Sequence, residues 1–149
     1  EELIVNFLDI LENHKMLVEN SGLLTVAALK HLDCKGKRVV SILSGGNMDI
    51  ITLSSVVQHG LIARGRVFTV AVQLPDRPGE LVNVADIIAK EKGNVIRLEH
   101  NQFVSINRNA AVELRITLEA FGQEHKNEIL KALRDKGYDA KEETPTGMY

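Results

Sequence analysis

The chain has 149 residues, a formal net charge of −2, 44% hydrophobic residues and 26% charged residues. This balance is typical of a globular protein and excludes a disordered, collagen-like or strongly basic nucleic-acid-binding chain. Its apolar runs are shorter than the roughly 20 residues of a membrane-spanning helix. We therefore expect neither nucleic acid nor a membrane as a partner.

The cysteine and histidine residues indicate the redox compartment and whether a metal site is expected. Cys34 has no second cysteine with which to form a disulfide, which favours a reducing compartment, and we expect a cytoplasmic protein. The five histidines lack the paired spacing of metal ligands, so we expect no metal site. The first residue is Glu1 rather than methionine, which favours a piece of a longer protein.

The first part of the sequence predicts three helices and one strand. Ser21 predicts the N-cap of a helix that is apolar almost all round and therefore buried on every side, and Gly60 predicts the end of the last helix. The strand is a continuous apolar run, typical of the centre of a parallel sheet. We expect a first helix that begins near Ile4 and ends near residues 13–15, further helices over residues 23–29 and 50–59, and the strand over residues 38–43.

This lone strand has no sequence partner with which to pair its backbone groups. Residues 1–62 are therefore expected to be the C-terminal end of a larger α/β domain whose remainder is missing. Alternatively, these elements are buried against a second copy of the chain. Residues 61–66 are expected to form a short basic linker.

The remainder predicts the order strand, helix, strand, strand, helix, strand, which is the ferredoxin-like βαββαβ arrangement of the α+β class, an antiparallel sheet with two helices on one face. Residues 103–109 interrupt the alternation, and residues 107–109 are expected to form a hairpin loop. Residues 143–149 are expected to form a loose tail. The apolar face should carry Phe68, Val70, Val72, Leu74, Ile96, Leu98, Val112, Leu114, Ile116 and Leu118. The solvated face should carry Thr69, Gln73, Arg97, Glu99, Glu113, Arg115, Thr117 and Glu119.

The turn between the first strand and the first helix has the residues of an anion-binding helix start. Pro78 suits a first helical turn because its missing N–H has no intrahelical partner there. Gly79 allows a sharp turn and leaves the helix N-terminus uncovered. The free N–H groups and partial positive charge of such an end can hold a carboxylate.

This turn, Asp76-Arg77-Pro78-Gly79-Glu80-Leu81, the strand entry Gly93-Asn94-Val95-Ile96 and the element order resemble an ACT domain, the small amino-acid-sensing module of metabolic enzymes. The resemblance implies that residues 63–142 form a regulatory domain. It also implies an effector site where the turn of one copy meets a neighbouring copy. That site would consist of Asp76, Arg77, Pro78, Gly79, Glu80, Leu81, Asn94, Val95 and Ile96.

The first part carries a second resemblance. Glu19-Asn20-Ser21-Gly22, the Ala27-Ala28-Leu29 helix, the strand from Gly36, Ser44-Gly45-Gly46-Asn47 and the Gly60 to Arg66 segment together look like the end of a pyridoxal-phosphate-dependent threonine dehydratase, in which an ACT domain often follows.

That resemblance implies a cofactor-binding role for five residues. The Ser44 hydroxyl would lie near the pyridine nitrogen, Gly45 and Gly46 would let the backbone approach the ring, Asn47 would brace the loop, and Glu19 matches a glutamate near the cofactor. A neutral serine there suits β-elimination better than transamination. The Asn-Ser-Gly that follows Glu19 departs from the more usual Gly-Ala-Gly or Pro-Ala-Gly.

The family's Schiff-base lysine, in a Ser-x-Lys-x-Arg setting, and its glycine-rich phosphate loop do not occur in this sequence. We therefore expect a catalytically inactive regulatory piece of threonine ammonia-lyase, which assembles as a homodimer or larger even oligomer and responds to isoleucine or valine. The alternative is a free-standing amino-acid sensor or oligomerisation module. An RNA-binding ferredoxin-like domain is excluded, because the open sheet face carries charged residues and threonine rather than aromatic residues.

Overall fold

The computed structural model describes residues 2–101 and 112–143, so the expected hairpin loop at 107–109 and residues 144–149 of the expected tail lie outside the described residues. The chain divides into two compact units, Glu1–Ala63 and Arg64–Tyr149.

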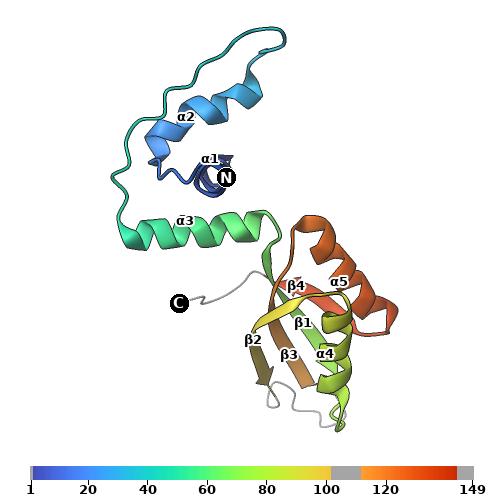
Figure 1. Cartoon of the computed structure of the whole chain (residues 1–149). Helices are drawn as coiled ribbons and strands as arrows, with labels where there is room; N and C mark the ends of the chain where they lie inside the picture. The colour runs from blue at the N-terminus through green and yellow to red at the C-terminus, as the bar shows by residue number, and fades with distance from the viewer. Residues whose placement is uncertain (1, 102–111, 144–149) are drawn as a thin grey trace. The chain divides into compact units, whose positions relative to one another are not determined.

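The first unit is a small helical assembly. It consists of α1 (Glu2–His14), α2 (Asn20–Ala28), the 3₁₀ helix η1 (Leu29–His31) and α3 (Ile50–Ala63). Helix α1 packs against both α2 and α3 (Figure 1). Its small core contains Phe7, Val18 and Leu23, each at most 3% exposed.

Two expected helix boundaries in this unit are wrong. Helix α2 begins at Asn20 with Glu19 as its N-cap, and Ser21 instead donates a hydrogen bond of 2.5 Å to the Glu19 carboxylate. Helix α3 continues through Gly60 to Ala63. A Cβ atom at Gly60 would lie 2.5 Å from Cδ1 of Leu8, so this glycine allows α3 to approach α1 rather than ending the helix.

The expected strand over residues 38–43 is also wrong, because this segment forms no ladder with any described residue. Val40 is 87% exposed and Ile42 is 75% exposed. A strand needs a neighbour for its backbone groups, and the described part of the first unit contains none. Helix α2 is likewise not buried on every side, since Leu24 is 57% exposed.

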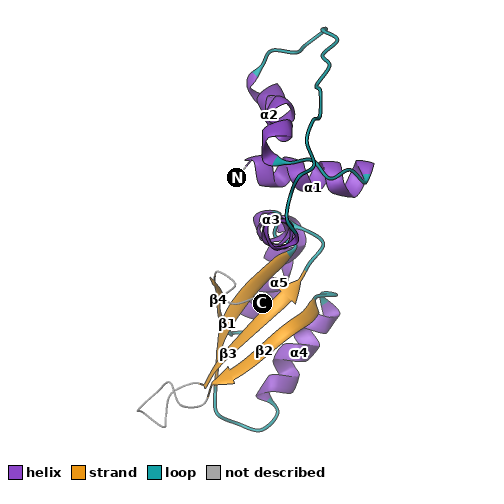
Figure 2. Cartoon of the chain, turned by 90° about the vertical axis from the view of Figure 1, so that its left-hand side faces the viewer, coloured by secondary structure: helices purple, strands orange, loops and turns teal. Residues whose placement is uncertain are grey.

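The second unit confirms the ferredoxin-like α+β fold. Its four strands form an antiparallel sheet in the order β2-β3-β1-β4, and α4 and α5 cover one face (Figures 1 and 2). The elements are β1 (Val67–Leu74), α4 (Glu80–Lys90), β2 (Asn94–Asn101), β3 (Val112–Glu119), α5 (Gln123–Asp135) and β4 (Asp139–Glu143).

The core of this unit lies between the two central strands and the two helices. Val70 pairs with Ile116 and Val72 with Leu114, and these side chains are at most 1% exposed. The helices contribute Val84 and Ile88 from α4 and Ile129, Leu130 and Leu133 from α5. Burial of this apolar surface is the main stabilising term of the unit.

The edge strand β2 departs from the expected alternation. Ile96 is 51% exposed and Leu98 is 43% exposed, although both were expected on the buried face. The β2–β3 register shifts between Val95 and Arg97, so Ile96 has no partner in the β3 ladder, whereas Leu98 still lies opposite the buried Ile116. As the outermost strand, β2 also has a neighbour on one side only.

The open face of the sheet is less solvated at its centre than expected. Thr69 and Thr117 are each 7% exposed and pair across the two central strands. Their hydroxyl oxygens lie 3.0 Å apart and form a hydrogen bond. Mutual satisfaction of the two hydroxyls makes burial of this polar pair tolerable.

The Leu114→Ala variant tests where the core lies. Because Leu114 is 0% exposed at the centre of β3, the truncation should lower the free energy of unfolding by about 2–5 kcal/mol. Val82→Ala in α4 is the control within the same unit and should cost much less, since Val82 is 69% exposed. Urea unfolding followed by circular dichroism measures both, and equal losses would contradict the assigned core.

Candidate functional site

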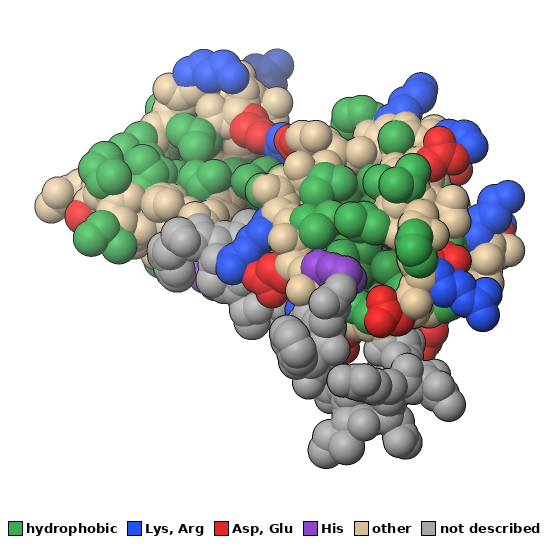
Figure 3. All heavy atoms as spheres, turned by 90° about the horizontal axis from the view of Figure 1, so that it is seen from below, with side chains coloured by type: hydrophobic (Ala, Val, Ile, Leu, Met, Phe, Trp, Pro, Cys, Tyr) green, Lys and Arg blue, Asp and Glu red, His purple; other side chains and the backbone are tan. Residues whose placement is uncertain are grey.

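The turn between β1 and α4 lines a hollow of about 320 Å³ at one end of the sheet. Gly79 is the N-cap of α4 with φ of +96°, and no described side chain caps the helix. Pro78 therefore precedes the helix instead of lying in its first turn. Figure 3 shows apolar side chains and a histidine gathered on the side seen from below. The hollow is lined by Leu74, Pro75, Asp76, Arg77, Pro78, Gly79, Glu80, Leu81, His100 and Val112.

The Glu80 carboxylate is engaged in a hydrogen bond within the second unit. It accepts a hydrogen bond of 3.0 Å from the hydroxyl of Tyr138, which follows α5. Burial, and after it this hydrogen bond, raise the pKa of Tyr138 above its usual value. Glu80 therefore contributes its position at the helix start rather than a free charge to the hollow.

The other expected effector residues lie at the opposite end of the sheet. Asn94 begins β2 and pairs with Glu119, which also pairs with Val67 at the start of β1. The turn follows Leu74, at the far end of β1. A single chain therefore does not bring the Asp76–Leu81 turn together with Asn94, Val95 and Ile96.

Asn94 itself is held in place from two directions. Its side-chain amide donates a hydrogen bond of 3.2 Å to the Glu119 carboxylate. Before it, the N–H groups of Lys92 and Gly93 bond to the carbonyls of Ala89 and Ile88, which closes α4 in a Schellman arrangement. The left-handed residue of this cap is Lys92, with φ of +62°.

His100 is a lining residue that the sequence did not suggest. It pairs with Leu114 near the end of β2 and lies beside the Asp76–Leu81 turn. Its position could have been inferred only from the strand order and directions, which place the ends of β2 and β1 at the same end of the sheet, on either side of β3. Spacing along the sequence contains no such signal.

The expected cofactor-binding residues do come together in the first unit. The backbone N–H of Glu19 donates a hydrogen bond of 3.0 Å to the carbonyl of Gly45. A Cβ atom at Gly45, where φ is +79°, would lie 2.4 Å from Cδ of Glu19. On the other side of the loop, a Cβ atom at Gly22 would lie 2.1 Å from the carbonyl oxygen of Ser44.

These contacts fit one edge of a pyridoxal phosphate site. Glu19 packs over Gly45, so the loop requires a residue without a side chain there. Ser44 and Asn47 are exposed next to it, and the Ser44 hydroxyl can donate a hydrogen bond to a ring nitrogen. The residues that the chain supplies are a hydroxyl, an amide and a tightly turned backbone.

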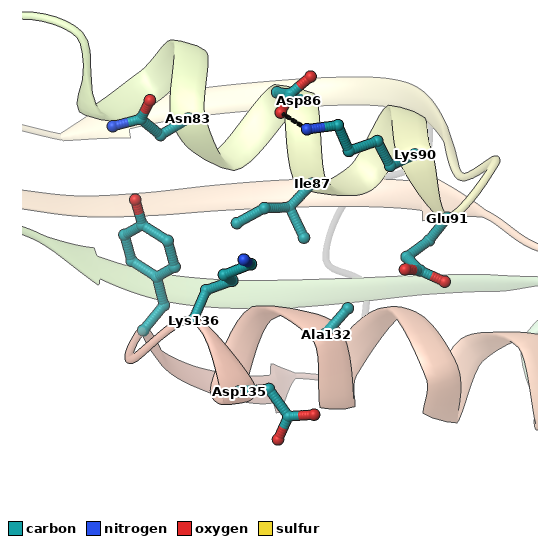
Figure 4. Close-up of a pocket in the computed structure, with 9 residues that line it drawn as sticks. Asn83, Asp86, Ile87, Lys90, Glu91, Ala132, Asp135 and Lys136 are labelled. Atoms are coloured by element: carbon teal, nitrogen blue, oxygen red, sulfur yellow. Dashed lines mark hydrogen bonds and ion pairs between the residues drawn. The ribbon is translucent and has the colours of Figure 1, made fainter.

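A larger groove, of about 520 Å³, runs between α4 and α5 on the helical face (Figure 4). Lys90 forms an ion pair of 2.5 Å with Asp86 along one wall. Asp135 and Lys136, at the end of α5, lie along the opposite wall (Figure 4). The groove is lined by three carboxylates and two lysines, so charges of both signs are mixed along it and it offers no cluster of one sign to a ligand.

Within residues 2–101 and 112–143, no three histidine, cysteine, aspartate or glutamate side chains are grouped so that they could hold a metal ion. No helix in the same ranges is long and apolar enough to cross a membrane.

Gly45→Ala tests the packing of Glu19 on the loop. Gly36→Ala is the matched control, because Gly36 has φ of +72° but nothing within 4 Å of an added Cβ. Both variants should lose about 1 kcal/mol from left-handed strain, and Gly45→Ala should lose more because it displaces the Glu19 side chain. In a Glu19→Ala background the extra loss in urea unfolding should disappear, and its persistence would contradict this packing.

No protein-family model matches the chain. Solved structures with similar parts include the aspartate kinase regulatory subunit of Thermus flavus, at 18% identity and a TM-score of 0.43 over 53% of this chain and 52% of that one. Prephenate dehydratase of Streptococcus mutans matches at 19% identity and a TM-score of 0.42, over 51% of this chain and 40% of that one.

Curated relatives match almost the whole chain. L-threonine ammonia-lyase of Geobacter sulfurreducens is 38% identical over 93% of this chain and 35% of that protein. The enzyme of the same name from Thermotoga maritima is 33% identical over 95% of this chain and 35% of its own length. A biosynthetic L-threonine dehydratase of Pasteurella multocida is 31% identical over 93% of this chain and 27% of its own length. The chain spans about a third of these relatives, and it is homologous to that part of the threonine ammonia-lyases, which confirms the family resemblance seen in the sequence.

Proposed function

We propose that this chain is the regulatory C-terminal part of a cytoplasmic threonine ammonia-lyase, the enzyme that converts L-threonine to 2-oxobutanoate and ammonia. Residues 1–62 end its catalytic domain, residues 63–142 form its amino-acid-binding ACT domain and residues 143–149 are a tail. The observation that carries this proposal is homology over 93% of the chain to only 35% of a threonine ammonia-lyase.

The two units support this division because only one of them closes its own core. The second unit has a complete sheet with two helices over it. The first unit leaves large apolar side chains in solvent, which suits a surface that the remainder of a catalytic domain covers. These side chains are Met16, Leu17, Leu24, Leu32, Val39, Val40, Ile42, Ile50 and Ile51.

In the whole enzyme, the loop of Ser44, Gly45, Gly46 and Asn47 with Glu19 would form one edge of the pyridoxal phosphate site. This cofactor, when bound, supplies the electron sink for β-elimination. The Ser44 hydroxyl would hydrogen-bond the ring nitrogen without giving it a full proton. Glu19 would hold the loop through its contacts with Gly45.

The isolated chain should neither retain pyridoxal phosphate nor deaminate threonine, because the Schiff-base lysine of the family has no counterpart in its sequence. Gel filtration after incubation with the cofactor, followed by absorbance of the protein peak and an ammonia assay, measures both properties. A stoichiometric cofactor band or sustained ammonia release would overturn the assignment of a catalytically incomplete piece.

We assign the β2 edge as the surface through which two copies assemble. The other edge, β4, is only five residues long and carries charged side chains, which discourage strand pairing. Strand β2 has eight residues and exposes Val95, Ile96 and Leu98. Antiparallel pairing of two β2 strands about a twofold axis would satisfy both edges.

Such pairing would also complete the effector site. In an antiparallel pair of β2 strands, the Asn94 end of one copy lies beside the His100 end of the other. His100 lines the hollow of the Asp76–Leu81 turn. The two groups of effector residues, which lie at opposite ends of one sheet, would therefore meet across the interface.

The chemistry of this combined site fits a branched aliphatic amino acid. The uncapped start of α4 offers the N–H groups of Leu81 and Val82 to an α-carboxylate. Asp76 of one copy and Asn94 of the other can bond the α-amino group. Leu74 and Val112 supply an apolar wall for the side chain. Isoleucine is the first candidate and valine the second.

Ile96→Lys tests the interface. We expect the wild-type chain to sediment as a dimer or larger even oligomer at micromolar concentration and Ile96→Lys to sediment as a monomer. The reason is that a charge at a half-exposed edge position opposes strand pairing but leaves the fold intact. Val40→Lys, at a position 87% exposed in the first unit, is the control and should remain oligomeric. Dissociation by Val40→Lys instead would move the interface to the first unit.

Titration calorimetry of the chain with L-isoleucine tests the effector site. Gly79→Asp should abolish binding, because it places a carboxylate where that of the effector would lie. Gly137→Asp is the matched control, since Gly137 also has a positive φ and open space around it. This variant should bind L-isoleucine like the wild-type chain. If the wild-type chain assembles but binds neither isoleucine nor valine, the second unit is an oligomerisation module and the sensing proposal fails.

A further inference from the structure

His125, on the first turn of α5, joins two chain segments that are remote in sequence. Its Nε2 lies 2.5 Å from the carbonyl oxygen of Glu91, at the end of α4. Its Nδ1 accepts a hydrogen bond of 3.0 Å from the backbone N–H of Phe121, just after β3. Phe121 also stacks on the imidazole, with ring centroids 4.7 Å apart and an angle of 16° between the planes.

The two backbone partners define the protonation state of the ring. A carbonyl can only accept, so Nε2 of His125 carries the proton. A backbone N–H can only donate, so Nδ1 must be without a proton. Both hydrogen bonds are therefore formed only by the neutral imidazole with its proton on Nε2, and protonation of Nδ1 removes the bond to Phe121.

The segments joined by His125 are those that position Asn94. From Glu91, two residues of the α4 cap lead directly to Asn94. From Phe121, one residue, Ala120, leads back to Glu119, whose carboxylate accepts the hydrogen bond of 3.2 Å from the Asn94 side chain. The imidazole thus connects the backbone on both sides of the Asn94–Glu119 pair.

We propose that neutral His125 is a positioning residue of the effector site, and that its protonation loosens the Asn94 wall and weakens effector binding. This inference rests on the proposed function for its effect on affinity, but the coupling between His125 and Asn94 is a property of the unliganded chain. Measured from about pH 8 down to about pH 5, affinity should fall when Nδ1 of His125 gains a proton, because that proton removes the hydrogen bond from Phe121.

Charged groups of both signs surround this imidazole. Lys90, Glu91 and Lys92 lie at the end of α4, and Glu124 and Glu128 lie on α5. Three of these groups are carboxylates and two are lysine ammonium groups. The geometric change on protonation of Nδ1 is the loss of its hydrogen bond from Phe121.

Nuclear magnetic resonance of the unliganded chain tests the coupling. Long-range nitrogen correlations should show the Nε2-protonated ring of His125 at the high end of this pH range. The backbone amides of Phe121 and Asn94 should shift with the same midpoint as the His125 imidazole. In His125→Asn, whose side-chain oxygen replaces Nδ1 as acceptor without titrating, these shifts should disappear. In His100→Gln they should persist, which excludes His100 of a second copy as their source.

Calorimetry with L-isoleucine then measures the effect on the site. His125→Ala removes both bonds and should weaken binding about fivefold to tenfold. His125→Asn should bind more tightly than His125→Ala and lose the additional pH dependence of the wild-type chain. The positioning role would be overturned if the amide signals of Phe121 and Asn94 did not shift together with the His125 imidazole. It would also be overturned if His125→Ala bound L-isoleucine with unchanged affinity. Failure of isoleucine to bind the wild-type chain would overturn the proposed function, and the amide shifts would still decide the coupling.

Discussion

The pairing of β1 with β3 is the interaction on which the rest of the second unit depends. It forms the centre of the sheet, holds the core side chains under α4 and α5, and fixes which loops lie at which end. Because β1 ends at the turn into α4 while β2 begins at the end of the sheet where β1 starts, the turn and Asn94 are separated by the length of the sheet. An effector that needs both would have to bind between two copies, and the β2 edge, which exposes Val95, Ile96 and Leu98, is the surface proposed for that pairing.

The first unit differs from the second in how much apolar surface it leaves exposed. Its helices fold against one another, but much of their apolar surface is not covered. Helices α1, α2 and α3 share a core, yet Val40 and Ile42 lie in an extended segment with their side chains largely in solvent. Regulation in the whole enzyme would have to pass from the second unit to this one, whose Ser44–Asn47 loop is held by Glu19. Binding energy at the effector site could change activity only by favouring one arrangement of these parts over another.

The sequence predicted most of the second unit because hydrophobic periodicity and turn residues agree there. The apolar face expected for β1 and β3 is buried along the whole of both strands, since both are central strands with clear alternation. The β2 pattern failed at Ile96, because a register shift next to it cannot be seen in the residue types. The strand expected at residues 38–43 failed because strand formation depends on a partner. His100 and His125 were missed as site residues, since their positions depend on sheet order and on backbone partners remote in sequence.

The central claim, that each effector site is built from two copies, is tested most directly by mixing two inactive variants. Gly79→Asp damages the turn and Asn94→Ala damages the opposite wall, so neither should bind L-isoleucine by itself. In an equimolar, re-equilibrated mixture, half of the dimers contain one chain of each kind, and each of those has one intact site. Calorimetry should then recover about a quarter of the wild-type binding sites. No recovery from a mixture shown to form mixed dimers would contradict the account, because a site within one chain is damaged in every molecule.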